Sequence, residues 1–175
     1  MAIDKNKYKN LLCRVESNCN YKIINSIGAL GKYQFTLSTL NALKNKYNLP
    51  AFINSTNFIN RPDLQELYFD YLVFDSLNFI ANNNLDQYKG RQVTGTMKYK
   101  NVQAPLNTYG MLAAIHLAGA TALKNFLENG YNPNDGNASL SDYAAYFSKN
   151  LIESDLTGLK EILLAIIPGI VLYYI

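Results

Sequence analysis

The chain has 175 residues, of which 49% are hydrophobic and 17% charged, and its formal net charge is +3. These values are typical of globular proteins, so they exclude wholesale disorder, and the length predicts one domain with a full core. The mild positive charge favours an anionic surface such as bacterial cell wall and is too small for a nucleic-acid-binding protein.

The N-terminal part predicts two helices separated by an irregular passage. Asp4 can cap a first helix that ends at about Ser17. Residues 21–33, which contain two glycines, predict irregular chain or a short hairpin. A second helix begins at Thr36 or Ser38. The apolar face of the first helix is formed by Tyr8, Leu11, Leu12 and Val15.

The middle of the chain predicts a loop and a long helix. The second helix ends before Pro50, and the asparagine-rich run 54–60 predicts a loop. Pro62 suits the first position of a third helix, which reaches about Ile80. Its apolar stripe is expected at Leu64, Leu67, Tyr68, Tyr71 and Leu72.

A small flap and a central helix are predicted next. Residues 88–104 favour a two-stranded flap. Thr108 can cap a helix whose alanines and glycines allow close packing, as a central helix requires. A break is expected near Gly119, and the resumed helix stops at Gly130 in the left-handed conformation.

The C-terminal end divides into a last helix and a hydrophobic segment. Ser139 or Ser141 caps the helix, and no linker divides the chain before it, so residues 1–155 are predicted as one domain. Residues 156–175 are set apart because 162–175 carry no charge. A bilayer span needs about 20 apolar residues. Three interpretations stay open: an element packed on the domain, which we favour, a contact with another protein, or a membrane-active tail.

Two cysteines flank Glu16. If the helix ran through both Cys13 and Cys19, a rise of 1.5 Å per residue would separate them by about 9 Å, too far for a disulfide. If the helix ends at Ser17, a disulfide becomes feasible. We favour two buried thiols and keep the disulfide as the alternative. With one histidine and no further cysteine, no metal site is expected.

A carboxylate followed by a glycine-punctuated loop marks the N-terminal part. Glu16-Ser17 is followed by GALGKYQF at 28–35 and by T-x-x-T-L at 36–40. These sequences resemble the first catalytic motifs of the lytic transglycosylases, which have a lysozyme-like fold: E-S-G, then G-x-x-G-L-M-Q, then a helix. Asn18 replaces the glycine of the first motif, and Lys-Tyr-Gln replaces Leu-Met-Gln. The Tyr-Gln-Phe form is similar to phage and secretion-associated members.

The later part of the chain extends the resemblance. LAAIHLAGATALKNFL at 112–127, an Asp-Gly-Asn loop at 135–137 and SLSDYAAYF at 139–147 follow in the family's order. The resemblance covers roughly Leu11 to Phe147. It implies cleavage of the β-1,4 bond between N-acetylmuramic acid and N-acetylglucosamine, with Glu16 as the catalytic acid and then base.

The chemistry of glycosidic cleavage supports Glu16 as the acid. The reaction needs a proton donor to the leaving oxygen and a means to stabilise the oxocarbenium-like state. A glutamate donor must hold its proton near neutral pH, which apolar surroundings favour. Such surroundings are expected for Glu16 from Val15, Leu11, Leu12, Tyr33 and Phe35. A surface glutamate at a helix end is the alternative.

No second carboxylate occurs between Glu16 and Asp63. A lysozyme-type nucleophile would be expected within that stretch. Its absence suits a mechanism in which the substrate's own N-acetyl group assists and its own 6-hydroxyl attacks. An inverting hydrolase that uses a distant acid, Asp63 or Asp135, stays open, because distance in sequence does not fix distance in space.

Three residues near Glu16 are candidates for substrate binding. Gln34 corresponds to the glutamine of the family motif, which implies a hydrogen bond to the N-acetyl group or the stem peptide. Ser17 would orient Glu16 or contact sugar, and Tyr33 would stack on a sugar ring. The alternatives are an ordinary hydroxyl at a helix end and a core tyrosine.

Further candidates lie in the C-terminal half. His116 lies in Ala-Ile-His-Leu-Ala-Gly, roughly where transglycosylases carry Ala-Tyr-Asn-Ala-Gly, with the register shifted by one residue. It is either a donor in the cleft or a buried core histidine. Tyr109 and Tyr143 are candidates of the same kind.

We therefore predict a mainly α, lysozyme-like domain with a small β-flap that acts as a lytic transglycosylase without metal or cofactor. The expected partners are peptidoglycan strands and, through the C-terminal segment, virion or secretion-apparatus proteins or a membrane; no nucleic acid is expected. The start, MAIDKNKYKNLL, lacks a secretory signal, which predicts delivery to the cell wall or periplasm by a virion, a secretion apparatus or lysis. The alternatives are a hydrolysing muramidase or chitinase-like enzyme and a non-catalytic structural or pore component of a phage tail or secretion apparatus.

Overall fold

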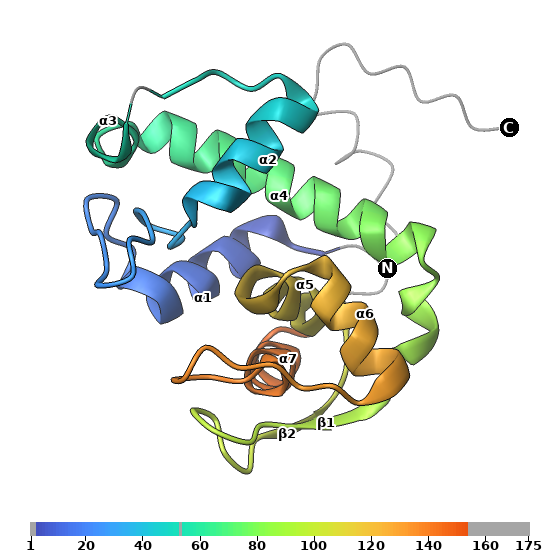
Figure 1. Ribbon diagram of the computed structural model, residues 1–175. Coiled ribbons are helices and arrows are strands. Elements are labelled where there is room, and N and C mark those ends of the chain that lie inside the picture. The colour runs from blue at the N-terminus through green and yellow to red at the C-terminus, as the bar shows by residue number, and fades with distance from the viewer. Residues whose placement is uncertain (1–2, 53, 154–175) are drawn as a thin grey trace, which may run out of the picture.

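The computed structural model describes residues 3–52 and 54–153, and this part of the chain is mainly helical with one small sheet (Figure 1). The mainly α prediction is thereby confirmed. The segment 156–175, with the three interpretations of its role, lies outside the described residues. In chain order the elements are α1 (Lys5–Ser17), α2 (Leu37–Tyr47), α3 (Ser55–Ile59), α4 (Pro62–Asn82), the 3-10 helix η1 (Leu85–Tyr88), β1 (Gln92–Thr94), β2 (Gln103–Pro105), α5 (Thr108–Ala118), α6 (Ala120–Asn129) and α7 (Leu140–Asn150).

Helix starts follow the local capping chemistry. The side chains of Asp4, Thr36 and Ser139 each accept a hydrogen bond from a backbone N–H in the first turn of α1, α2 and α7. The cap of α5 is Asn107, one residue before the predicted Thr108, which is instead the first helical residue. The side-chain carbonyl of Asn107 accepts a hydrogen bond from the backbone N–H of Gly110, which is the capping role expected of Thr108.

The asparagine-rich run 54–60 is not a loop, and this prediction was wrong. It forms α3, because the Asn54 side chain accepts a hydrogen bond of 2.8 Å from the backbone N–H of Asn57 and so caps the helix. Phe58 is fully buried. Capping and burial therefore outweigh the low helix propensity of asparagine.

The buried face of α4 is displaced from the predicted stripe, of which Leu67, Tyr71 and Leu72 are only half-buried. Leu64 and Tyr68 are buried as expected, but Gln65 and Phe69 are buried as well. The reason is that α1 and the loop 21–33 cover this side of the helix, where the rings of Tyr8 and Tyr33 lie against Phe69. Gln65 is tolerated there because its amide accepts from the Lys32 N–H and donates to two backbone carbonyls.

The centre of the fold is α5, in which every residue from Thr108 to Ile115 is buried. It lies in the interior of the helical assembly, with α7 beside it (Figure 1). A side chain at Gly110 would collide with the Ser148 hydroxyl and the Ala144 carbonyl of α7. The glycine thus permits the close approach of the two helices.

The predicted flap is a two-stranded antiparallel sheet. Val93 pairs with Ala104 at its centre, and both side chains are buried. The loop between the strands is held by the Asp142 carboxylate of α7, which accepts hydrogen bonds from the backbone N–H groups of Met97, Lys98 and Tyr99. The same carboxylate accepts from the N–H and hydroxyl of Ser139. The flap is therefore fixed to the N-terminus of α7.

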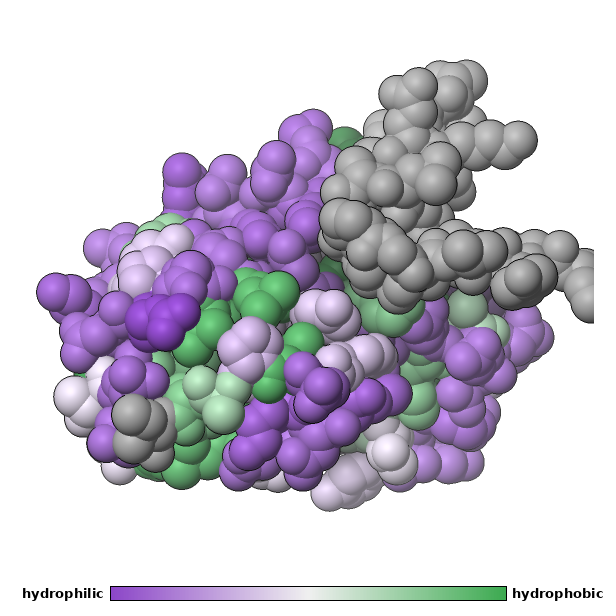
Figure 2. All heavy atoms as spheres, turned by 90° about the horizontal axis from the view of Figure 1, so that it is seen from above, coloured by the Kyte–Doolittle hydropathy of each residue, from purple (hydrophilic) through white to green (hydrophobic). Residues whose placement is uncertain are grey.

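Figure 2 shows the molecule from above, relative to the view in Figure 1. This face is largely hydrophilic, with a smaller apolar area in its middle. Within the described ranges, no helix combines the length and the apolar character that crossing a membrane requires. Large hydrophobic side chains that are exposed include Ile24, Ile27, Leu37, Met97, Tyr131 and Ile152.

Candidate active site

Glu16 lies in the last turn of α1. The helix ends because Asn18 takes the left-handed conformation, with φ 53°, and its N–H bonds back to the Cys13 carbonyl. The Glu16 side chain is 13% exposed, so it is largely covered but reaches the surface. A carboxyl in this position is accessible to a ligand while being partly withdrawn from water.

Two predicted site residues converge on Glu16 from distant parts of the chain. The Tyr143 hydroxyl, on α7, donates a hydrogen bond of 2.7 Å to Glu16 Oε1. The Nε2 atom of His116, on α5, lies 3.7 Å from the same oxygen. Three helices therefore supply one carboxyl, one phenol and one imidazole, and we call this the Glu16 cluster.

The protonation of the two partners follows from their burial. Burial lowers the pKa of His116 and outweighs the opposing effects of the Glu16 carboxylate and the Tyr33 backbone. The imidazole is therefore neutral near pH 7. Burial, followed by the Glu16 carboxylate, raises the pKa of Tyr143 far above its usual range. Tyr143 accordingly stays protonated and donates to Glu16.

Tyr99 brings the flap to the cluster, and sequence reasoning missed it. Its ring stacks on Tyr146 at 4.0 Å between centroids and lies 6.4 Å from the ring of Tyr143. Burial, Tyr146 and then Glu16 raise the pKa of Tyr99 to about 12. In the sequence, Tyr99 lies in the predicted flap between two lysines, which suggests an exposed residue. Nothing in the sequence indicates that its ring lies near Tyr143.

Ser17 and Gln34 shape the loop opposite Glu16. The Ser17 hydroxyl donates a 2.7 Å hydrogen bond to the Lys32 carbonyl and so ties the end of α1 to the loop. Gln34 has φ 51°, and its amide donates to the Gly31 carbonyl at 2.8 Å. Both predicted residues lie near Glu16 in the structure, and the side chain of each forms a hydrogen bond with a backbone carbonyl of the loop.

Tyr33 and Tyr109 do not face a cleft, so their prediction as substrate-binding residues was wrong. Tyr33 is fully buried and stacks on Phe69 at 4.0 Å. The Tyr109 ring is buried too, and its hydroxyl accepts a hydrogen bond from the backbone N–H of Asp4. Each ring fills the core, and its one polar atom is bonded inside the protein.

The hydroxyl of Tyr33 belongs to a charge cluster around Glu66 that the sequence did not reveal. The Glu66 carboxylate accepts from Tyr33 at 2.9 Å and pairs with Lys9 and Lys32, each at 2.8 Å. Burial acts to raise the pKa of Glu66, but the hydrogen bonds from Lys32, Lys9, Tyr21 and Tyr33 outweigh it and lower the pKa to about 2. A carboxylate so firmly ionised cannot serve as a general acid; it holds the loop to α1 and α4.

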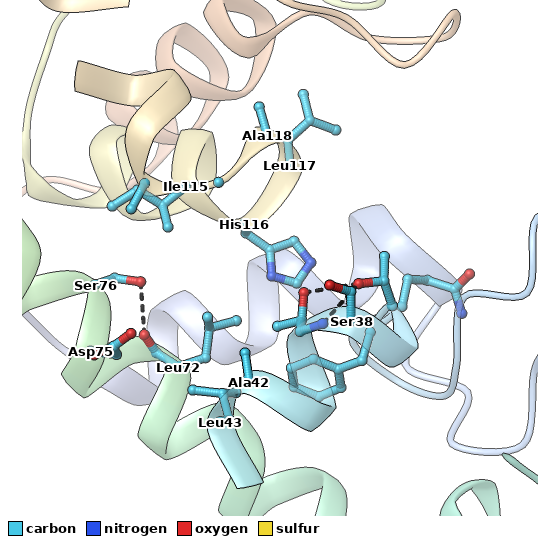
Figure 3. Close-up of a pocket in the computed structure, with 16 residues that line it drawn as sticks. Ser38, Ala42, Leu43, Leu72, Asp75, Ser76, Ile115, His116, Leu117 and Ala118 are labelled. Atoms are coloured by element: carbon cyan, nitrogen blue, oxygen red, sulfur yellow. Dashed lines mark hydrogen bonds between the residues drawn. The ribbon is translucent and has the colours of Figure 1, made fainter. Parts of the chain in front are cut away.

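A cavity of about 430 Å³ lies next to the Glu16 cluster, between α2, α4 and the junction of α5 and α6 (Figure 3). Gln34 and His116 both line it. Glu16 does not, and it reaches the cavity only through His116, 3.7 Å away.

Cys13 and Cys19 form a disulfide, so the preference for two buried thiols was wrong. The helix does not continue past Ser17. Asn18 and Cys19 both take positive φ, 53° and 61°, which turns the chain back and brings the two cysteine Cα atoms to 4.5 Å. That separation lies within the range that a disulfide spans. Glu16 lies within the short loop of chain that this disulfide closes.

Loss of the bridge is expected to destabilise the protein by about 2 kcal/mol, the loop-closure entropy of a ring this small. Cys19→Ser removes it at the less buried cysteine, and thermal unfolding with and without dithiothreitol measures the effect. Wild type should melt lower in reductant, whereas the variant should be insensitive to it. Equal melting temperatures of oxidised wild type and variant would show that the bridge contributes nothing.

Comparison of this chain with family models, with curated proteins and with solved structures finds no match. Among the residues described, no group of three or more histidine, cysteine or acidic side chains is arranged to hold a metal ion.

Proposed function

We propose that the chain is a peptidoglycan-cleaving lytic transglycosylase of lysozyme-like architecture, with Glu16 as its acid and base. One observation carries the proposal: a single, largely covered carboxyl at a helix end, with Tyr143 donating to it and a neutral imidazole beside it. The sequence motifs around Glu16 supply the substrate class. The mainly helical fold with its small sheet is compatible with a lysozyme-like architecture.

The reaction would proceed in two proton transfers. Glu16 protonates the glycosidic oxygen, and the bond from that oxygen to the anomeric carbon breaks. The muramyl N-acetyl carbonyl stabilises the cation that develops at this carbon. The ionised Glu16 then takes the proton from the sugar's 6-hydroxyl, whose oxygen closes on the anomeric carbon. Tyr143, which stays protonated, stabilises the carboxylate between the two steps.

Two other carboxylates, those of Asp63 and Asp142, are already engaged in contacts of their own. Asp63 forms an exposed ion pair with Arg61 at the start of α4. The Asp142 carboxylate is buried and is engaged by the flap and Ser139. Their existing partners therefore disfavour a role for either as a second acid.

The product is the sharpest test of this mechanism. Because no water enters, muropeptides released from purified sacculi should carry 1,6-anhydro ends, lighter by one water than hydrolysis products. Mass spectrometry of the digest measures this, and zymography on peptidoglycan first establishes that the protein cleaves at all. Reducing ends alone would reject the transglycosylase mechanism, and the absence of any cleavage by folded protein would favour the structural component of a phage tail or secretion apparatus.

A hydrolysing muramidase is the second candidate, and Asp135 is the observation in its favour. This acid lies on an exposed loop, and its charge contributes to raising the pKa of Tyr143, after burial, Glu16 and Tyr99. It could activate water on the far face of the sugar. Asp135→Asn should leave the rate unchanged if the substrate assists itself, whereas a loss of about 10²-fold or more would support the hydrolase.

A further inference from the structure

The disulfide spans the one helical turn that carries Glu16. Cys13 lies within α1, three residues before Glu16, and Cys19 lies two residues beyond the end of that helix at Ser17. The bridge therefore joins the body of α1 to the chain that leaves it. The last turn of a helix frays easily, because its carbonyls lack partners within the helix. Glu16 stands in this turn, so the order of the turn decides where its carboxyl lies.

The other bonds that hold this turn are near the surface. The N–H groups of Asn18 and Cys19 share one acceptor, a carbonyl in the preceding turn of α1. The Ser17 hydroxyl donates to the Lys32 carbonyl at 2.7 Å and accepts from the Asn20 N–H at 3.1 Å, which ties the turn to the loop beside it (Figure 1). Asn18 and Asn20 are exposed, so water competes for these bonds. The covalent bridge is the contact that water does not weaken.

The backbone of Cys19 is in a conformation that cysteine does not favour. Its φ is 61° and that of Asn18 is 53°, both in the left-handed region. Asparagine enters this region readily, but for most other residues it costs free energy. The bridge imposes the conformation by holding Cys19 against Cys13, with 4.5 Å between their Cα atoms. When the bridge opens, Cys19 lowers its free energy by returning to a negative φ, and the chain then turns away from Cys13.

The partners of Glu16 do not depend on this turn. Tyr143, whose hydroxyl lies 2.7 Å from the Glu16 carboxylate, and His116, 3.7 Å from it, are buried side chains of α7 and α5. Both helices pack against each other in the centre of the fold. If the last turn of α1 unwinds, the carboxyl therefore moves away from a phenol and an imidazole that stay in place. Displacements of about 1 Å in such a site can lower a rate by about 10²-fold.

A reducing thiol can reach the bridge from the side of Cys19. Cys19 is half-buried, whereas Cys13 is 1% exposed. A thiolate of a dithiol attacks the Cys19 sulfur, the S–S bond breaks, and the Cys13 sulfur leaves with the electron pair. The second thiol then attacks the mixed disulfide and releases Cys19. Each cysteine sulfur takes up one proton, and the dithiol, which gives up two protons and two electrons, leaves as a cyclic disulfide.

We propose that the Cys13–Cys19 bridge is a redox switch of the Glu16 cluster. In the oxidised protein the bridge keeps Glu16 in contact with Tyr143 and His116, and in the reduced protein the last turn of α1 opens and the contact is lost. The biological role rests on the proposed function. The bacterial cytosol keeps thiols reduced and the periplasm oxidises them. The site would thus be inactive where the chain is made and active at the cell wall.

NMR of the oxidised protein and of the protein reduced with dithiothreitol tests the switch without any substrate. Hydrogen exchange of the Asn18 and Cys19 amides should rise by about tenfold or more on reduction, because the constraint on their turn is lost. The ring signals of Tyr143 should shift as the bond to Glu16 breaks. The ring of Tyr109 is the internal control, since it is bonded at the other end of α1 and should not respond.

Cys19→Ser is the matched variant, because it keeps the size of the side chain and cannot form the bridge. Its Tyr143 ring signals and its exchange in the turn should match those of reduced wild type, with and without dithiothreitol. On purified sacculi, wild type should lose about tenfold or more of its rate on reduction, whereas the variant should be slow in both conditions. All assays are run below the melting temperature of the reduced protein, so that global unfolding does not contribute.

Two results would overturn the switch. Reduction that leaves the Tyr143 ring and the exchange of the turn unchanged would show that Glu16 is held without the bridge. Shifts that extend to Tyr109 and to the amides of α5 would show that the bridge supports the whole fold and has no specific effect on the site. The NMR readout is independent of catalysis: a protein that responds as expected but leaves sacculi intact keeps the switch and loses the enzymatic function, and a cleaving protein that ignores reductant loses only the switch.

Discussion

Glu16→Gln is expected to abolish peptidoglycan cleavage and to leave the fold intact. Glutamine keeps the shape of the side chain and its acceptor oxygen for the Tyr143 hydroxyl, 2.7 Å away, but has no transferable acidic proton. Loss of the general acid should lower the rate by about 10²–10⁴ or more. Turbidity clearing of purified sacculi measures the rate, and thermal unfolding checks the fold.

Tyr143→Phe is the matched control for this experiment. It removes the hydrogen bond to Glu16 but leaves the carboxyl and the buried ring in place. The rate should fall by less than in Glu16→Gln, because the acid itself remains. A well-folded Glu16→Gln protein that clears sacculi at a near-normal rate would remove Glu16 from the mechanism.

Asp142→Ala should produce the largest loss of stability. The substitution leaves the backbone N–H groups of Met97, Lys98, Tyr99 and Ser139 without their acceptor. Buried unsatisfied donors cost about 1–3 kcal/mol each, so even with partial access of water we expect a loss of roughly 3 kcal/mol. The melting temperature should fall by on the order of 10 °C.

The stabilisation by Asp142 should depend on pH with a defined sign. Burial acts to raise the pKa of this carboxyl, but the bonds from Ser139, Met97 and Tyr99 outweigh it, and the pKa is lowered in the folded state. The contribution is therefore complete above the unfolded pKa near 3.9 and is lost as the pH falls through the folded value. The difference between wild type and Asp142→Ala should narrow below about pH 4. A difference that stays constant down to pH 2 would contradict the role of the ionised form.

The elements near the site were predictable because their signals are local. The cap at Asp4, the proline that begins α4 and the break at Gly119 each follow from one residue's backbone chemistry, and all are observed. Glu16 and His116 were singled out in the sequence, and the structure brings them together.

What sequence reasoning missed depends on contacts between elements. The sequence around Tyr33 does not indicate whether its ring faces a cleft or the core. The ring lies in the core because it stacks on Phe69, a residue far away in the sequence. Gln65 looked like an ordinary polar residue of a long helix, yet it bonds to the loop at Lys32 and Tyr21 and to the Phe58 carbonyl of α3. The disulfide required two successive residues with positive φ, and only the asparagine at 18 gives a signal for that conformation.

The burial of α5 has a consequence for how the molecule opens. Because every residue from Thr108 to Ile115 is buried, this part of the helix cannot become exposed to water without disrupting the packing around it. Its amide protons should exchange with deuterium only when the whole domain unfolds, whereas those near exposed Ile24 and Ile27 should exchange through small local openings. His116 lies one residue beyond the enclosed stretch, so the imidazole stands at the boundary between the slowest-exchanging region and the surface that a ligand reaches.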